Sequence, residues 1–177
     1  KIEKPCYTVI WTTTPWTIPA NQAINMHPDL SYALVDCGDK YLILGANLVE
    51  DCLKRYKLEG KIVGETNGKN LDHVRFMHPF SQLHEGFKRF SPVYLGEYVE
   101  ATSGTGVVHS APAYGLDDFV SCKANGMTND QILNPVMGNG VYADWLPLFG
   151  GLNIWKAQPK IVDTMRVAGV LLNCEMI

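Results

Sequence analysis

The sequence predicts a mainly β domain with peripheral helices, a β-barrel-like α+β fold. Three observations lead to this class. Short apolar runs rich in Val, Ile, Tyr and Thr recur along the 177 residues, turn residues separate these runs, and the runs do not alternate regularly with helical segments. The length is that of one domain, so we expect residues 1–177 to form a single compact domain.

Six segments are expected to be strands, because each is a short run of β-branched and aromatic residues bounded by turn signals. The first contains the apolar run from Tyr7 to Trp11, which predicts a buried strand. A further signal, Cys37-Gly38-Asp39-Lys40 between two of the runs, predicts a hairpin. The six ranges are Tyr7–Thr13, Ala33–Asp36, Tyr41–Leu44, Ile62–Thr66, Pro92–Leu95 and Gly106–Ser110.

Three helices are expected from amphipathic spacing and end signals. Asn47–Tyr56 places its apolar residues on one side. Leu116–Asn125 begins with two aspartates, which favour a helix N-terminus, and a glycine follows it. Lys160–Ala168 also has an apolar face and stops at a glycine. Residues 170–176 are then expected to return as a strand.

The composition excludes several classes of protein. With 46% hydrophobic and 19% charged residues it is typical of a soluble globular protein, and no apolar run is long enough to span a membrane. The first residues do not resemble a signal peptide, and the absence of a starting Met indicates an excised fragment. The formal net charge of −3 argues against broad electrostatic capture of nucleic acid, although it permits contact with a short single-stranded end.

Metal and cofactor signals are missing from the sequence. The five cysteines have no C-x-x-C spacing and their count is odd, which predicts free thiols in a reducing cytosol. There is no H-E-x-x-H, no G-x-S-x-G, no Walker loop and no G-x-G-x-x-G. We therefore expect neither a metal nor a cofactor, and a metal hydrolase is an alternative without the required ligand spacing.

The most informative segment runs from Trp11 to Asn21, Trp-Thr-Thr-Thr-Pro-Trp-Thr-Ile-Pro-Ala-Asn. Threonines at a strand end can offer hydroxyl and backbone groups to a sugar and a water, and the prolines stiffen the loop. A tryptophan between prolines can form a pocket wall. Each candidate also has a structural alternative: threonines that cap their own backbone, a core tryptophan, and an asparagine that bonds its own loop. The candidates are Thr12, Thr13, Thr14, Trp16 and Asn21.

A second segment, Gly104–Phe119, carries a histidine and two aspartates beside an expected helix start. His109 ends a strand and precedes Asp118 by nine residues, a spacing that can bring a strand end and a helix start to one rim. A histidine at a strand end is more often structural, and Asp117 and Asp118 both suit the helix dipole. One aspartate could serve the helix while the other faces a ligand ammonium.

Together the two segments resemble the editing domain of isoleucyl-tRNA synthetase, in its bacterial or organellar form. That domain hydrolyses valine wrongly joined to the isoleucine tRNA. Three further stretches resemble the same family: Asn134-Pro135-Val136, Gly140-Val141-Tyr142 and Phe149-Gly150-Gly151-Leu152-Asn153-Ile154-Trp155-Lys156-Ala157.

Two differences from the sister leucyl and valyl editing domains favour the isoleucyl branch. Those domains usually have Thr-Thr-Arg-Pro-Glu-Thr, where this chain has Thr14 and Trp16 in place of Arg and Glu. They also generally lack a histidine at the position of His109. Family members continue past Ile177 into a His-x-Tyr-Pro segment whose Tyr completes the pocket, so we expect weak activity of the isolated chain.

The resemblance implies a hydrolase that acts on valyl-tRNA(Ile) and on valyl-adenylate. Its implied partners are the 3′ end of the mischarged tRNA and the rest of the synthetase in cis, in the cytoplasm, or in the mitochondrion for an organellar form. The ATP site belongs to the parent enzyme. By position, Asp118 holds the aminoacyl ammonium and His109 limits side-chain size. Trp16 is a pocket wall, Asn21 lies near the site, and Thr12, Thr13 and Thr14 surround the terminal adenosine and the water.

Two other functions compete with this hypothesis. The chain could be a binding module that holds the tRNA end but cannot hydrolyse without the rest of the enzyme. It could also be a structural insertion whose editing has decayed, although the intact threonine, histidine and aspartate set argues against decay. Release of valine and isoleucine from their tRNA esters distinguishes these alternatives.

Overall fold

The computed structural model describes residues 2–176, which form two compact units. The chain passes from one unit to the other several times, and both sequence motifs lie at such a passage. One passage falls between Trp11 and Thr12 and another between His109 and Ser110. Unit 1 contains residues 2–11, 24–76 and 92–109, and unit 2 contains residues 12–23, 77–91 and 110–176.

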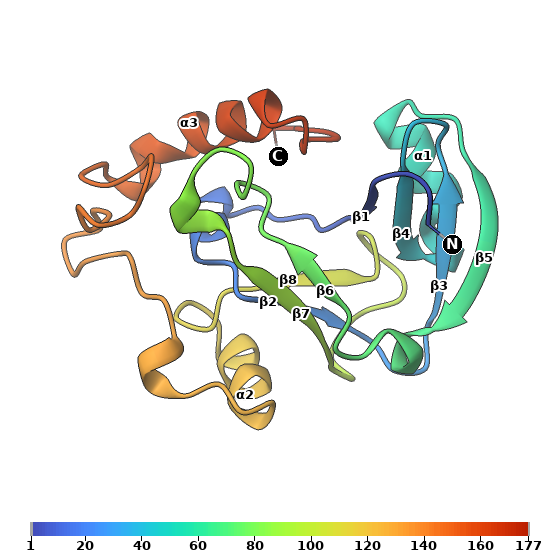
Figure 1. The fold of residues 1–177 in the computed structure, drawn as a ribbon, viewed down its shortest axis with the longest axis horizontal. Coiled ribbons are helices and arrows are strands. Elements are labelled where there is room, and N and C mark those ends of the chain that lie inside the picture. Colours follow the sequence, from blue (N-terminus) through green and yellow to red (C-terminus); the bar gives the residue numbers. More distant parts are fainter. Residues whose placement is uncertain (1, 177) are drawn as a thin grey trace. The chain divides into compact units, whose positions relative to one another are not determined.

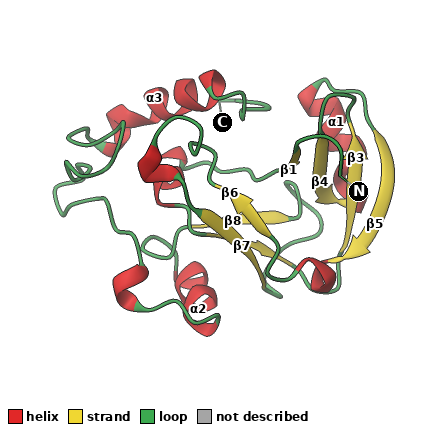
Figure 2. Ribbon diagram, in the orientation of Figure 1, coloured by secondary structure: helices red, strands yellow, loops and turns green. Residues whose placement is uncertain are grey.

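Eight strands form two four-stranded sheets in the described part of the chain (Figures 1 and 2). The strands are β1 Cys6–Thr8, β2 Ala23–Met26, β3 Ser31–Asp36, β4 Tyr41–Gly45, β5 Lys61–Asn67, β6 Arg75–Met77, β7 Phe90–Leu95 and β8 Val107–Ser110. One sheet has the order β1-β4-β3-β5, in which β1 is parallel to β4 and β3 is antiparallel to both β4 and β5. The other has the order β6-β7-β2-β8, with β2 parallel to β7.

The prediction of a mainly β fold with peripheral helices is confirmed. The structure is not a closed barrel, because the strands of residues 2–176 divide between two sheets and neither sheet closes on itself. The expected strand at residues 170–176 is wrong, since these residues have no regular structure. Strands β2 and β6 were not expected, because each is only three or four residues long.

The first strand is shorter and more exposed than the sequence predicts. β1 ends at Thr8, and the Tyr7 side chain is 41% exposed, so the expected buried strand Tyr7–Thr13 is wrong. Trp11 follows outside any regular element and lies against Gly104, where an added Cβ would come within 1.9 Å of the indole Nε1. Gly104 has a φ of +67°, so both its conformation and its missing side chain hold Trp11 in place.

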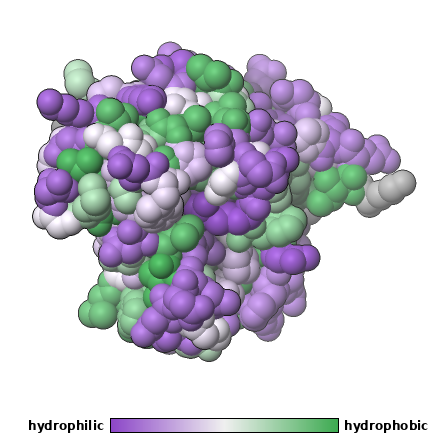
Figure 3. Space-filling view, turned by 60° about the vertical axis from the view of Figure 1, so that its left-hand side comes forward, coloured by the Kyte–Doolittle hydropathy of each residue, from purple (hydrophilic) through white to green (hydrophobic). Residues whose placement is uncertain are grey.

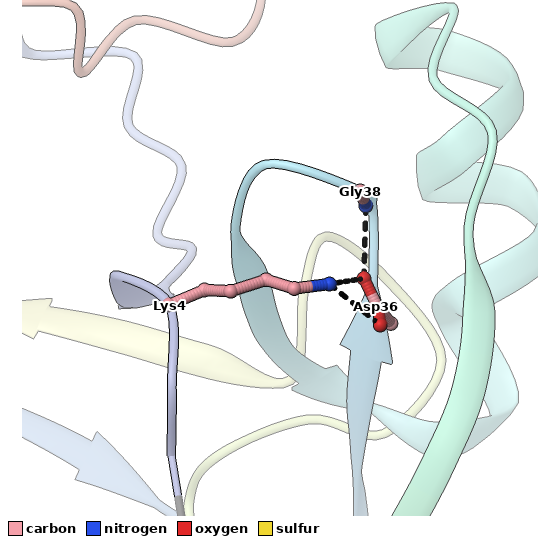
Figure 4. Close-up of polar contacts among 3 residues, drawn as sticks. All are labelled: Lys4, Asp36 and Gly38. Atoms are coloured by element: carbon pink, nitrogen blue, oxygen red, sulfur yellow. Dashed lines mark hydrogen bonds and ion pairs between the residues drawn. The ribbon is translucent and has the colours of Figure 1, made fainter.

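The hairpin between β3 and β4 forms as predicted. The Cys37 amide donates to the Lys40 carbonyl at 2.9 Å, and Gly38 takes a φ of +92°, which glycine adopts without strain. The Asp36 carboxylate accepts from the Gly38 amide at 2.9 Å and from Lys4 Nζ at 2.7 and 2.9 Å (Figure 4). The hydrogen bond from Lys4 lowers the pKa of Asp36. These contacts fix the turn geometry, but a solvent-screened ion pair adds little stability.

Each unit has its own core. In unit 1, apolar side chains of four strands pack together, and the buried Tyr32 hydroxyl donates to the Gly106 carbonyl at 2.6 Å, just before β8. In unit 2, aromatic rings form the core, and their edge-to-face contacts stabilise it beyond simple area burial. The unit 1 cluster is Ile24, Met26, Tyr32, Val93 and Val107. The unit 2 rings are His78, Phe80, Phe87, Tyr142 and Phe149.

Helices surround these cores. The α-helices are α1 Val49–Tyr56, α2 Leu116–Ala124 and α3 Ile154–Val167, and α3 lies beside the short helix η1 in unit 2 (Figure 1). The 3₁₀-helices are η1 Pro15–Ala20, η2 Ala46–Leu48, η3 Gly68–Leu71, η4 Glu85–Phe87 and η5 Asn129–Gln131. None of the helices in residues 2–176 has the length and apolarity needed to cross a membrane. On the face drawn in Figure 3, apolar residues form separate patches among polar ones.

Glycines end two of the α-helices as predicted, but α3 begins earlier than expected. Gly126 and Gly169 have φ values of +91° and +71° immediately after the caps of α2 and α3. The α3 helix begins at Ile154 rather than Lys160, because the Asn153 side chain caps it by accepting from the Trp155 amide at 3.0 Å. Pro159 lies inside the helix, so this proline is not the helix start.

Candidate active site

The threonine loop bends its hydroxyls onto one place. Thr12 Oγ1 accepts from the Thr14 amide at 3.0 Å and lies 3.2 Å from Thr14 Oγ1. The Thr14 carbonyl accepts from both the amide and the hydroxyl of Thr17, each at 3.0 Å. Thr13 and Thr14 are exposed. The loop therefore caps its own backbone, as the structural alternative predicts, and still presents hydroxyls to solvent.

The helix that follows, η1, cannot form all of its internal backbone hydrogen bonds. Pro19 has no N–H, so the 3₁₀ bond from residue 19 to the Trp16 carbonyl cannot form. The Tyr142 hydroxyl donates to the Trp16 carbonyl instead. The buried His78 ring donates from Nε2 to the Ile18 carbonyl at 2.9 Å. Side chains far along the chain thus complete the backbone bonding of η1.

Asn21 is buried, at 6% exposed, and its amide is engaged by the protein. Its Nδ2 donates to the Ala23 carbonyl at 3.0 Å and approaches the Ser110 carbonyl at 3.5 Å. Its Oδ1 accepts from the Ser91 hydroxyl. The side chain therefore ties the end of the first motif to two other segments of unit 2.

Ser110 joins the two motifs. Its carbonyl accepts from the Gln22 amide at 3.0 Å, immediately after the first motif. The next residue, Ala111, donates its amide to Asp118 Oδ2 at 3.0 Å. The strand end at Ser110 therefore contacts the end of the Trp11–Asn21 segment on one side and leads to the start of α2 on the other. Within unit 2 the structure thus brings the end of the first segment beside the Ser110–Asp118 part of the second.

Asp118 is the half-buried carboxylate of the pair at the start of α2, and Asp117 is exposed. Burial raises the pKa of Asp118, and the hydrogen bond from the Ala111 amide acts in the opposite direction. Gly115 makes room for this carboxylate, because an added Cβ would lie 2.8 Å from Asp118 Oδ2. The two aspartates therefore differ in burial and in hydrogen bonding, and the role of Asp118 toward a ligand stays a prediction.

An aromatic corner stands beside this junction. The rings of Trp16 and Tyr114 meet edge to face, with centroids 5.1 Å apart. The Tyr114 hydroxyl donates to Asn134 Oδ1 and accepts from the Val136 amide, both at 3.0 Å, which fixes its ring. The indole Nε1 of Trp16 is buried and has no hydrogen-bond partner among the described residues. A rigid apolar wall with one available donor suits a bound aliphatic side chain and a nearby polar atom.

His109 precedes Ser110 in β8 and belongs to unit 1. Burial lowers the pKa of its imidazole to about 4. A ring with this pKa is neutral at physiological pH, because its charged form is disfavoured by desolvation. His109 is therefore better suited to shape and neutral hydrogen bonding than to carrying a positive charge.

Unit 2 contains a cavity of about 180 Å³, and Pro19 is the η1 residue that lines it. Its walls are mostly apolar, and the only charged side chain among its lining residues is that of Arg89. The lining consists of Pro19, Gly86, Arg89, Leu133, Pro135, Trp145, Leu146 and Pro147.

Metal-ligand geometry is not found in residues 2–176, where no three His, Cys, Asp or Glu side chains are placed to hold an ion. The five cysteines are free thiols, of which Cys52 and Cys122 are buried.

Several contributors to this site could not be identified from the sequence. His78, Arg89 and Ser91 donate to residues 18–21, and Tyr142 donates to residue 16, yet none carries a motif. Arg89 had one indirect signal, since it is a cation that precedes an apolar strand. Their roles depend on contacts across 60 or more positions, which no local pattern encodes.

No family model matches the chain. Three isoleucine–tRNA ligases are similar to it, from Cupriavidus pinatubonensis (58% identical over 96% of the chain), Azoarcus sp. (60% over 97%) and Pseudomonas fluorescens (59% over 100%). The chain spans 18% of the length of each of these relatives.

Solved structures agree on the fold. The crystal structure of GlLeuRS-CP1 superposes with a TM-score of 0.77 at 15% identity, over 99% of this chain and 87% of that one. A P. falciparum cytosolic leucyl-tRNA synthetase editing domain superposes with a TM-score of 0.67 at 9% identity, over 94% of this chain and 79% of that one. The chain therefore belongs to the isoleucyl-tRNA synthetase family, of which it is a segment with the editing-domain fold.

Proposed function

We propose that this chain hydrolyses the ester of valyl-tRNA(Ile), and also acts on valyl-adenylate, as the editing module of an isoleucyl-tRNA synthetase. The observation that carries the proposal is the junction at Ser110. Its carbonyl accepts from the Gln22 amide, and the adjacent Ala111 amide binds Asp118. The residue that follows the first motif thus meets the strand end that leads to a half-buried carboxylate, and this supports a site for an aminoacyl ester and its ammonium.

The need for such a module is physical. One methylene in an apolar pocket changes binding by about 1–3 kcal/mol, a general value for which isoleucine against valine is itself the standard example. A synthetic site that fits isoleucine therefore admits valine too often. A second pocket that is too small for isoleucine can remove the error.

Each candidate has a role in this proposal. Asp118 holds the aminoacyl ammonium, and the hydroxyls of Thr12, Thr13 and Thr14 bind the terminal ribose and orient water. Trp16 packs against the valine side chain. His109 excludes a longer side chain through its neutral ring. Asn21 acts at the site through the backbone, because both ends of its amide bond protein atoms.

The mechanism needs no covalent nucleophile. Binding places the ester carbonyl beside a water held by hydroxyl and backbone groups, so that much of the rate comes from proximity and orientation. A hydroxyl of the terminal ribose can move the proton. The exposed Thr13 and Thr14 are the hydroxyls best placed to meet such a ligand from solvent.

The partners follow from the same proposal. The ligand is the single-stranded 3′ end of the tRNA, and a net charge of −3 cannot supply strong phosphate binding. Most of the affinity for tRNA must therefore come from other parts of the synthetase in cis. The cytoplasm is the proposed location, with the mitochondrion for an organellar form.

The deciding experiment compares release of valine and of isoleucine from the same tRNA(Ile). The purified chain and the synthetase that carries it are each incubated with the two esters, and the free amino acid is followed over time. We expect valine to be released much faster than isoleucine. Equal rates would exclude size selection, and tight binding without release by either protein would favour a tRNA-end binding module.

A further inference from the structure

Arg89 grips the backbone at the end of η1. Its Nη2 donates to the Pro19 carbonyl at 2.6 Å, and its Nε donates to the Asn21 carbonyl at 3.0 Å. A third donor, Nη1, approaches the Gly86 carbonyl at 3.5 Å. The two strong bonds come from one planar fork and reach two carbonyls on the same segment. Such a fork fixes the direction of the segment as well as its distance.

This guanidinium has no carboxylate partner within residues 2–176. It lies over the Phe87 ring, 5.6 Å from the centroid, and burial lowers its pKa to about 10. At neutral pH the group is still charged, so this partly buried cation is stabilised by backbone carbonyls and by the Phe87 ring. Removing a cation from water is costly unless it is hydrogen-bonded, and the bonds to the Pro19 and Asn21 carbonyls supply that compensation. The carbonyl end of a helix is where a positive charge is favoured.

Ser91 extends the same grip. It lies two positions after Arg89, in β7, and its hydroxyl donates to Asn21 Oδ1. Ser91 is 1% exposed. Together the two residues supply three donors to positions 19 and 21. Pro19 itself lacks the N–H that would have strengthened η1 from within.

We propose that Arg89, assisted by Ser91, is a positioning residue that holds the threonine loop in its reactive geometry without touching the substrate. The grip acts at the end of η1. Asn21 links this segment to the second motif, because its Nδ2 lies 3.5 Å from the Ser110 carbonyl oxygen. The next residue, Ala111, donates the amide that binds Asp118. At its other end, η1 starts at Pro15, directly after Thr14 of the threonine loop. This inference rests on the proposed hydrolytic function of the same site.

Such a role predicts a specific kinetic pattern. Asp118 belongs to α2 and not to η1, so loosening η1 leaves this carboxylate in place and the ammonium is still bound in the ground state. The water and the ester carbonyl lose their alignment, and misplacement of reacting groups by about 1 Å can cost on the order of a hundredfold in rate. The loss should therefore appear in kcat rather than in KM.

The experiment uses the synthetase that carries this chain, with valyl-tRNA(Ile) as substrate. Arg89→Met should lower kcat for valine release by about ten- to a hundredfold and leave KM within about twofold. Arg89→Lys keeps the charge without the fork and should restore only part of the rate. The matched control is Lys88→Met, which removes an exposed neighbouring charge paired with Glu85 and should leave both constants unchanged.

Two further measurements separate the possible outcomes. If Arg89→Met does not fold, Ser91→Ala is the milder variant, and it should lower kcat several-fold with the same constant KM. Incorporation of 5-fluorotryptophan gives a readout besides activity: the ¹⁹F resonance of Trp16, assigned with Trp16→Phe, should broaden or shift in the Arg89 and Ser91 variants.

Three results would overturn the inference: an unchanged kcat in folded Arg89→Met, a rise in KM alone, or full rescue by Arg89→Lys. A rise in KM alone would mean that Arg89 binds the substrate directly. Failure of the wild-type enzyme to release valine would instead contradict the proposed function, and the fluorine signal would still test the grip on η1.

Discussion

Replacing Asp118 by asparagine separates its charge from its shape. The asparagine oxygen can still accept from the Ala111 amide, which Asp118 Oδ2 contacts at 3.0 Å. It also occupies the same space beside Gly115, where no Cβ is present. The fold at the start of α2 should therefore persist. What the variant loses is the negative charge that we assign to the aminoacyl ammonium.

The expected loss follows from the environment of Asp118. A hydrogen bond to a charged group contributes about 1.5–3 kcal/mol, against about 1 kcal/mol for a neutral one. Because Asp118 is only half-buried, solvent screening places the difference at about 1.5 kcal/mol. Asp118→Asn should thus reduce valine release by about tenfold. Asp117→Asn, a neighbouring exposed carboxylate, should change the rate by less than about twofold.

Single-turnover hydrolysis of valyl-tRNA(Ile) at several pH values is the assay. If Asp118 binds the ammonium as proposed, its ionised form is the active one, and the rate should fall as the pH drops through its pKa. Burial raises that pKa, and the fall should begin above the pH at which an exposed aspartate protonates. Asp118→Asn should lose this acidic limb. A full wild-type rate in Asp118→Asn, or a larger loss in Asp117→Asn, would refute the assignment.

Three other predictions test separate features. His109→Ala should keep measurable valine release and gain hydrolysis of isoleucyl-tRNA(Ile), measured as the ratio of the two rates; loss of both activities would point to acid–base catalysis instead. Because the pKa of His109 is lowered to about 4, its ring should produce no step in the rate between about pH 6 and 8. Exhaustive chelation should leave valine release unchanged, and recovery of a chelator-inhibited enzyme by zinc would contradict this. Gly104→Ala should lower the free energy of unfolding by about 1–3 kcal/mol in urea titrations, since the new Cβ meets the Trp11 ring at a positive φ. Gly138→Ala, which meets nothing within 4 Å, is its control, and equal effects of the two changes would refute this explanation.

Local signals predicted the fold where local physics decides it. The glycines after α2 and α3 stop those helices because they adopt a left-handed conformation at no steric cost. The hairpin at Cys37–Lys40 formed for the same kind of reason. The start of α3 was misplaced, because the apolar face used to predict it begins at Ile161, whereas the Asn153 cap starts the helix earlier. The division of the strands between two sheets depends on long-range pairing, which no short pattern specifies.

In the candidate site, too, only the residues with a local sequence signal could be predicted. Asp118 and the threonines could be identified because each lies at an element boundary with an evident chemical use. The residues that hold the loop through hydrogen bonds could not be identified, because Arg89 and Tyr142 lie far from it along the chain. The burial of Asn21 could not be predicted from the sequence either, because its partner Ser91 lies 70 positions away. Roles for all of these residues in hydrolysis stay predictions.

The prolines of η1 also limit how far this loop can be transplanted. An ordinary helix carries its own ladder of bonds and can be moved between proteins as a cassette. Here Pro19 leaves the Trp16 carbonyl dependent on Tyr142, and the Ile18 carbonyl receives His78. A graft of the Trp-Thr-Thr-Thr-Pro-Trp string alone would arrive without these donors and would collapse onto other partners. Engineers who wish to build a smaller ester-cleaving scaffold must therefore take residues 77–91 and Tyr142 along with the loop.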